Sequence, residues 1–147
     1  PAIAGLGEAC RLAGEAMGES ASAVATLRDR LEAGVRALFP AARINGAAAE
    51  RLAGTSNISF PGYDGEAIVQ RLDRAGVAAA NGAACVAGGS QASHVLMAMH
   101  KDEALANSAV RFSFSRYNTM AEVDAALAAL ASALSDLAPE TAAVSGG

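Results

Sequence analysis

Two side chains in this sequence could take a direct part in chemistry, the thiol of Cys85 and the guanidinium of Arg111. Cys85 lies within a glycine-bracketed segment, residues 81–90, that predicts a loop accessible from outside. Its ordinary pKa is about 8.5, and no charged residue between Arg74 and Lys101 is close in sequence to lower it. Residue types alone support a nucleophilic thiol and a small structural side chain equally well.

Arg111 occupies the middle of an alternating segment, residues 109–114, in which its neighbours Val110 and Phe112 share the opposite face. A guanidinium is planar and can bind both oxygens of a carboxylate at once. The segment therefore predicts a strand that presents one carboxylate-binding side chain. The alternative is a strand arginine that simply faces solvent.

The remaining polar residues give weaker indications. His94 and His100 are six residues apart, a spacing that does not place them on one face of a helix, so a metal-binding pair is not predicted. Asn57 and Ser59 alternate with apolar residues and indicate only the exposed face of a strand. The paired glycines near Cys85 match neither a Walker-type nor a dinucleotide-binding pattern.

Helices are predicted where apolar residues recur at spacings of three and four, and strands where they alternate. Cys10 lies on the apolar stripe of the first helix and is predicted to be a core residue, while Gly18 predicts a bend or break in that helix. Thr119 and Glu122 have the spacing of a capping box. The predicted helices span 2–38, 64–75, 94–99, 102–107 and a long segment from Thr119 to Leu137, and the predicted strands span 43–44, 55–60, 77–80 and 109–114.

This order of elements predicts an α/β (α+β) fold in which helices cover one face of a small, mainly antiparallel sheet. The 147 residues suit one domain, and the net charge of −4 argues against a nucleic-acid partner. No apolar run approaches the roughly 20 residues that a membrane crossing needs. Two cysteines form no metal motif, and the absence of a secretory signal favours a cytoplasmic setting.

Four segments, in this order and at this spacing, together resemble the C-terminal portion of the NifS/IscS-like cysteine desulfurases, members of the class-V aminotransferase family. They are LAGTSNISFPG at 52–62, NGAACVAGG at 81–89, SHVLMAM at 93–99 and VRFS at 110–113. The resemblance extends over nearly the whole chain. It implies the C-terminal small domain of a fold-type-I enzyme that uses pyridoxal phosphate.

The resemblance also implies the site residues. Cys85 matches the catalytic cysteine, whose thiolate takes the sulfur of L-cysteine and leaves alanine and a persulfide. Arg111 matches the arginine that holds the substrate carboxylate. The sulfur then passes to an acceptor protein, such as an iron–sulfur scaffold, and selenocysteine remains open as an alternative substrate.

Two departures from the family pattern limit what this piece can do. Alanines and a valine surround Cys85 where the family has small hydroxyl residues, and the cofactor lysine belongs to a large domain absent from this sequence. Lys101, the only lysine, follows the Cys85 segment and does not match that residue. We therefore expect pyridoxal phosphate in the full-length parent, a homodimer, and no cofactor or activity in the fragment.

Residues 1–147 are thus predicted to be a C-terminal small domain, in which 1–20 belong to the helix that leads to the large domain and 139–147 form a flexible tail. The start at Pro1 suggests a processed product or a fragment. Two other classes stay open at this point. One is a stand-alone persulfide carrier, and the other is a structural or dimerisation module with an inert thiol.

Overall fold

The structure is a computed structural model and describes residues 1–81, 92–100 and 102–137. Cys85 and the predicted tail at 139–147 lie outside the described residues. The helices are α1 (Ala2–Leu38), α2 (Gly65–Arg74), α3 (His94–His100), α4 (Glu103–Asn107) and α5 (Met120–Asp136). The strands are β1 (Arg43–Ile44), β2 (Thr55–Ser59), β3 (Ala80–Asn81) and β4 (Ala109–Ser113).

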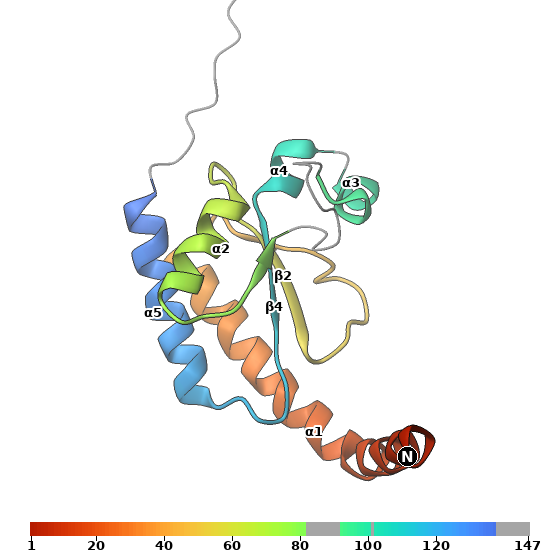
Figure 1. The fold of residues 1–147 in the computed structure, drawn as a ribbon. Coiled ribbons are helices and arrows are strands. Elements are labelled where there is room, and N and C mark those ends of the chain that lie inside the picture. The colour runs from red at the N-terminus through yellow and green to blue at the C-terminus, as the bar shows by residue number, and fades with distance from the viewer. Residues whose placement is uncertain (82–91, 101, 138–147) are drawn as a thin grey trace, which may run out of the picture.

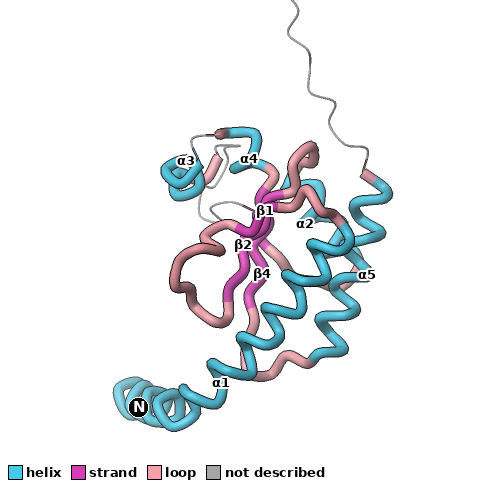
Figure 2. The backbone as a smooth tube through the Cα atoms, turned by 180° about the vertical axis from the view of Figure 1, so that it is seen from behind, coloured by secondary structure: helices cyan, strands magenta, loops and turns pink. Residues whose placement is uncertain are grey.

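The strands form one sheet in the order β1-β2-β4-β3, and each neighbouring pair is antiparallel. Helices α1, α2 and α5 lie together on one side of it, whereas α3 and α4 lie at one end of the sheet, as Figures 1 and 2 show from opposite sides. The predicted fold class is confirmed. A sheet covered in this way has one face packed into the core and one face available for a site.

The core lies between the sheet and the three longer helices. Alternation along the strands points Ile58 of β2 and Val110 and Phe112 of β4 towards these helices, and each of the three side chains is buried. Phe60, directly after β2, and eight helical residues contribute the other buried side chains of this cluster. The helical ones are Leu27, Leu31, Val35, Ile68, Leu72, Val123, Leu127 and Leu130.

Local capping residues fix where the helices begin. The Asp64 side chain accepts a hydrogen bond from the Glu66 amide at 2.9 Å and starts α2. Thr119 and Glu122 form the predicted capping box at the start of α5. Gly76 has a φ of +80° just past α2, the left-handed conformation in which glycine is favoured.

The predicted strand at 77–80 is wrong in its extent. The Val77 amide donates to the Leu72 carbonyl at 2.9 Å, so Val77 still closes the end of α2. The chain becomes a strand only at Ala80–Asn81. Pairing with β4, and not the apolar run in the sequence, therefore sets the bounds of β3.

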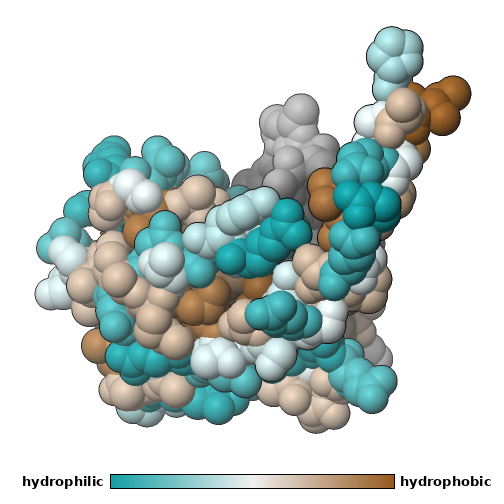
Figure 3. Space-filling model, turned by 90° about the horizontal axis from the view of Figure 1, so that it is seen from below, coloured by the Kyte–Doolittle hydropathy of each residue, from teal (hydrophilic) through white to brown (hydrophobic). Residues whose placement is uncertain are grey.

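The N-terminal half of α1 projects away from the sheet (Figure 1). The helix is continuous through Gly18, so a break is absent there, but α1 changes direction between its projecting end and the part beside the sheet (Figure 1). Cys10 is exposed, and its predicted place in the core is wrong, because no described element lies against this end of the helix. Ile3 and Leu6, on the same stripe, are 88% and 66% exposed, and Figure 3 shows apolar surface on the projecting end.

Within the described residues, no helix combines the length and apolar character that a membrane crossing needs.

Candidate active site

The sheet face opposite α1, α2 and α5 carries Asn57 and Ser59 of β2 and Arg111 of β4. Register pairs Asn57 with Arg111 and, two positions along, Ser59 with Ala109. Residues paired across antiparallel strands share a face, so these four side chains lie on the same side of the sheet. Ala109 is fully buried against Leu96 of α3 and Ala106 of α4.

Arg111 lies just beyond the part of this face that α3 and α4 cover. Its side chain is exposed, whereas Val110 and Phe112 on either side are buried in the core. Among residues 1–81, 92–100 and 102–137, no hydrogen bond or ion pair is made to its guanidinium. The arginine is therefore rooted in the central strand pair and, within the described part of the chain, presents a bidentate donor without a counter-charge.

Strand β3 leads directly into the segment that contains Cys85. Ala80 pairs with Arg111, and Asn81 pairs with Val110, so the chain leaves the sheet beside the predicted carboxylate-binding residue. Cys85 itself lies outside the described residues. Its place relative to Arg111 stays a prediction from the sequence.

A hydrogen-bonded group on this face was not predicted. Asn45 Nδ2 donates to Asn57 Oδ1 at 2.6 Å and to Ser59 Oγ at 2.9 Å. Asn45 is 6% exposed and Ser59 is fully buried, so Ser59 does not belong to an exposed strand face as the alternation suggested. The sequence does contain a signal for this group. Asn45 precedes the Gly46 turn, and Asn57 and Ser59 lie on one face of the strand opposite it.

The described part of the structure places neither histidine side chain at this site. His94 is exposed at the first position of α3, and the His100 side chain lies outside the described part of the chain. The described residues contain no group of three His, Cys, Asp or Glu side chains that could hold a metal ion.

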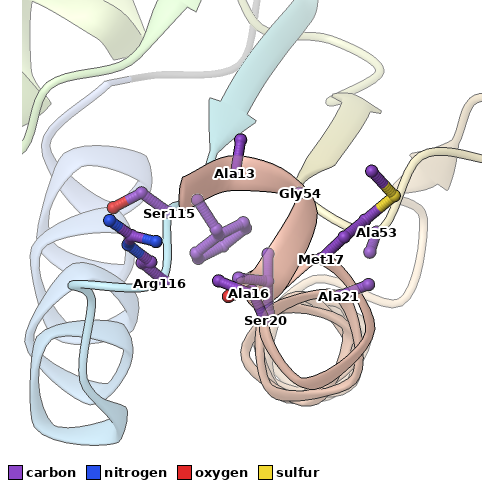
Figure 4. Close-up of a pocket in the computed structure, with 11 residues that line it drawn as sticks. Ala13, Ala16, Met17, Ser20, Ala21, Ala53, Gly54, Ser115 and Arg116 are labelled. Carbon is purple, nitrogen blue, oxygen red and sulfur yellow. The ribbon is translucent and has the colours of Figure 1, made fainter. Parts of the chain in front are cut away.

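A shallow groove lies elsewhere, between α1 and the segments that adjoin β2 and β4 (Figure 4). Its lining includes Met17, Val24 and Phe114, with Arg116 at one side. Arg116 donates to the Tyr117 hydroxyl at 2.8 Å. The described residues that line the groove carry no thiol, imidazole or carboxylate, so it suits apolar contact better than catalysis.

Comparison with known proteins finds cysteine desulfurases among the relatives of this chain. The chain is 46% identical over 130 residues to "Cysteine desulfurase" of Cereibacter sphaeroides, an alignment that covers 88% of this chain and 33% of that protein. It is 43% identical over 122 residues to "Cysteine desulfurase NifS" of Azotobacter vinelandii, which covers 83% of this chain and 30% of the relative. The chain thus spans about a third of the length of these relatives.

Solved structures give the same result. The NifS-like protein from Rickettsia africae superposes with a TM-score of 0.80 at 28% identity, over 92% of this chain and 34% of that one. The resemblance to cysteine desulfurases that the four sequence segments indicated is confirmed by these relatives. The sequence pattern described as "Aminotransferase class-V" matches residues 1–126, and the chain therefore belongs to the class-V aminotransferase family.

Proposed function

We propose that this chain is the C-terminal small domain of a pyridoxal-phosphate-dependent cysteine desulfurase. In this proposal Arg111 binds the carboxylate of L-cysteine, and Cys85 receives its sulfur. One observation carries the proposal. The Arg111 side chain is exposed on β4, and β4 pairs with β3, the strand that leads to Cys85. The named activity of the relatives supports it, since those proteins are cysteine desulfurases.

Arg111 has the chemistry that an amino-acid substrate requires. The arginine is always protonated at physiological pH, and its fork matches the two oxygens of a carboxylate. Pairing on both sides, with Asn57 of β2 and Ala80 of β3, fixes the Cα position from which the side chain extends. A rigid root reduces the entropy lost on binding and gives the carboxylate a defined position.

Cys85 has the chemistry that accepts sulfur. The carbon–sulfur bond of L-cysteine breaks, an S–S bond forms with Cys85, and the former thiol carbon gains a proton to give alanine. Cys85 is five positions along the chain from Ala80, a length that spans at most about 18 Å. Chain length thus allows the thiol to work near a substrate that is held at Arg111.

We propose that the lysine that carries the cofactor lies in the longer protein, outside this chain. Pyridoxal phosphate is attached through a lysine, and the described residues include none, since Lys101 lies outside them. When bound in the longer protein, the cofactor supplies the electron sink that carbon–sulfur cleavage needs. The chain would supply the carboxylate contact and the sulfur acceptor, and would have no desulfurase activity alone.

The exposed apolar end of α1 supports this division of the protein. Ile3 and Leu6 project from the N-terminal end of α1 and are 88% and 66% exposed. Helices in folded proteins gain most of their stability from packing of an apolar face. We propose that residues 1–20 belong to the helix that joins the large domain, and that the large domain covers them.

The parent protein would act as a homodimer in the cytoplasm and pass its persulfide sulfur to an acceptor protein. The acceptor would be of the iron–sulfur scaffold kind. A reducing compartment is consistent with the exposed thiol of Cys10 and with the need for a thiol at Cys85. The tail at 139–147 completes the proposed domain.

The test compares alanine release from L-cysteine by the full-length protein and by two cysteine variants. Cys85→Ser should reduce alanine release to background, and Cys10→Ser, the matched change at the other cysteine, should leave it unchanged. Mass spectrometry should find one added sulfur on the Cys85 peptide only. Alanine release by the Cys85→Ser protein would overturn the proposed role.

A further inference from the structure

Four residues form a single row across the sheet beside the proposed carboxylate site. The Asn45 amide donates to the Asn57 carbonyl at 2.8 Å, Asn57 pairs with Arg111, and Arg111 pairs with Ala80. Cross-strand partners have Cβ atoms about 5 Å apart. Asn57 is therefore the polar side chain that stands next to Arg111, because Ala80 on the other side has only a methyl group.

Asn57 could compete for the guanidinium. Arginine donates hydrogen bonds and accepts none, so an amide oxygen within reach can draw it down onto the sheet. An arginine held in that way would have to exchange one partner for another before it could bind a carboxylate. The direction of the Asn57 amide thus decides whether Arg111 is available.

The structure turns the acceptor of Asn57 away from Arg111. Asn57 Oδ1 accepts from Asn45 Nδ2 at 2.6 Å, on the β1 side of β2, whereas Arg111 lies on the β4 side. The two arms of a carboxamide diverge, so the Asn57 Nδ2 arm lies away from Asn45. Its N–H groups cannot accept a hydrogen bond from a guanidinium.

Burial holds the amide in this direction. Asn45 is 6% exposed, and its Nδ2 also donates to Oγ of the fully buried Ser59 at 2.9 Å. If a partner turned away, the buried donor would be left without its hydrogen bond, which would destabilise the folded state. Asn45 is thus held on two sides, and it holds Asn57 in turn.

We propose that Asn45 is a positioning residue for substrate binding: it keeps the Asn57 oxygen away from Arg111 and so leaves the guanidinium available to an external carboxylate. This inference rests on the proposed role of Arg111. It adds Asn45 and Asn57 to the residues that determine affinity for the substrate, without giving either of them a contact with the reacting atoms.

The test uses the full-length protein and the KM for L-cysteine. Asn57→Asp preserves the shape of the side chain and places a carboxylate oxygen on the Arg111 side. KM should therefore rise about fivefold, which corresponds to the upper range of energies for a cross-strand pair, and kcat should stay nearly unchanged. Ala128→Glu adds the same charge on the exposed side of α5, across the sheet from Arg111, and should leave KM unchanged.

A second pair of variants separates positioning from stability. Asn45→Ala releases the Asn57 amide, which can then accept from Arg111, and KM should rise. Adding Asn57→Ala removes the competing oxygen, and KM should return to the starting value although the fold has lost more contacts. A purely structural role predicts that the double variant binds substrate worse than either single variant.

A readout independent of activity is the modification of Arg111 by phenylglyoxal in cofactor-free, full-length protein, followed by mass spectrometry. Arg111 should react about fivefold more slowly in Asn57→Asp, while Arg116 reacts at an unchanged rate. This result in a protein without desulfurase activity would support the positioning and refute the proposed function. Unchanged Arg111 reactivity and unchanged KM in an active enzyme would overturn the positioning alone.

Discussion

Arg51 and Glu32 form a two-point ion pair that ties the β1–β2 connection to α1. Arg51 Nη1 and Nη2 donate to the two carboxylate oxygens of Glu32 at 2.7 and 3.2 Å, and Ser56 Oγ donates to the same carboxylate at 2.8 Å. The Glu32 side chain is 7% exposed and the Arg51 side chain 20% exposed. The pair is thus shielded from water, and its removal should affect the free energy of unfolding.

We predict that Arg51→Met destabilises the chain by about 3 kcal/mol or more, because a buried carboxylate then lacks its counter-charge. Adding Glu32→Gln removes that charge and should recover part of the loss. Urea unfolding followed by circular dichroism measures both values. Arg30→Met breaks an exposed pair with Asp124 and should cost less than about 1 kcal/mol. Equal losses at Arg51 and Arg30 would contradict this.

The same pair predicts how stability depends on pH. Burial by itself would raise the pKa of the Glu32 carboxyl, but the hydrogen bonds from Arg51 and Ser56, together with the positive charges of Arg51 and Arg28, outweigh it and hold the pKa below its ordinary value of 4.5. The unfolded chain therefore takes up the proton first as pH falls. The contribution of Glu32 to stability is complete above pH 4.5 and is lost as pH falls through the lower, folded pKa.

Wild-type chain should thus lose stability below pH 4.5 more steeply than Glu32→Gln. The measurement is the free energy of unfolding in urea between neutral and acid pH for the two proteins. Hydrogen bonds from Thr119 also lower the pKa of the Glu122 carboxyl. Both proteins contain Glu122, so its effect cancels in the difference between their stabilities. Parallel curves for the two proteins would show that Glu32 is not linked to folding.

The features that the sequence predicts correctly are local. Asp64 caps α2 and Thr119 caps α5, because a capping side chain bonds to an amide two or three residues away. Alternation likewise places Arg111 on the face of its strand away from Val110 and Phe112, which the structure confirms. These interactions depend on backbone geometry within a few residues, and one sequence contains that information.

The features that the sequence did not reveal depend on partners far along the chain. The bond between Asn45 and Asn57 spans twelve residues and exists only in one strand register. Cys10 lies on a regular apolar stripe, yet it is exposed because no described residue outside α1 covers this part of the stripe. Periodicity shows that a face can pack, but what lies against that face is a property of the whole fold.

Gly65 allows α2 to approach the junction of α4 and β4, and we predict that Gly65→Ala is destabilising. An added Cβ would lie 2.6 Å from the Asn107 carbonyl oxygen and 2.8 Å from that of Ala109. Both are backbone atoms that cannot rotate away, so the cost should be about 1–3 kcal/mol. Thermal and urea unfolding measure the loss.

Gly18→Ala is the matched control for that change. Gly18 lies inside α1 with nothing within 4 Å of the added carbon, so alanine should increase helix content with no loss of stability. Circular dichroism measures helix content directly. A Gly65→Ala protein as stable as the Gly18→Ala protein would show that α2 does not pack as closely as the structure describes.

The projecting end of α1 yields a prediction that compares this chain with the longer protein. Leu6 is 66% exposed here, so Leu6→Ala should change the stability of the chain by no more than about 0.5 kcal/mol, while Leu31→Ala in the core should cost about 2–5 kcal/mol. If the large domain covers residues 1–20, the Leu6 side chain is buried in the full-length protein. Leu6→Ala should then destabilise that protein well beyond its effect on the chain, because buried carbon atoms of the side chain are removed. Unfolding curves of both forms measure the difference. A small effect of Leu6→Ala in both would mean that this stripe stays exposed in the longer protein and would refute the proposed domain contact.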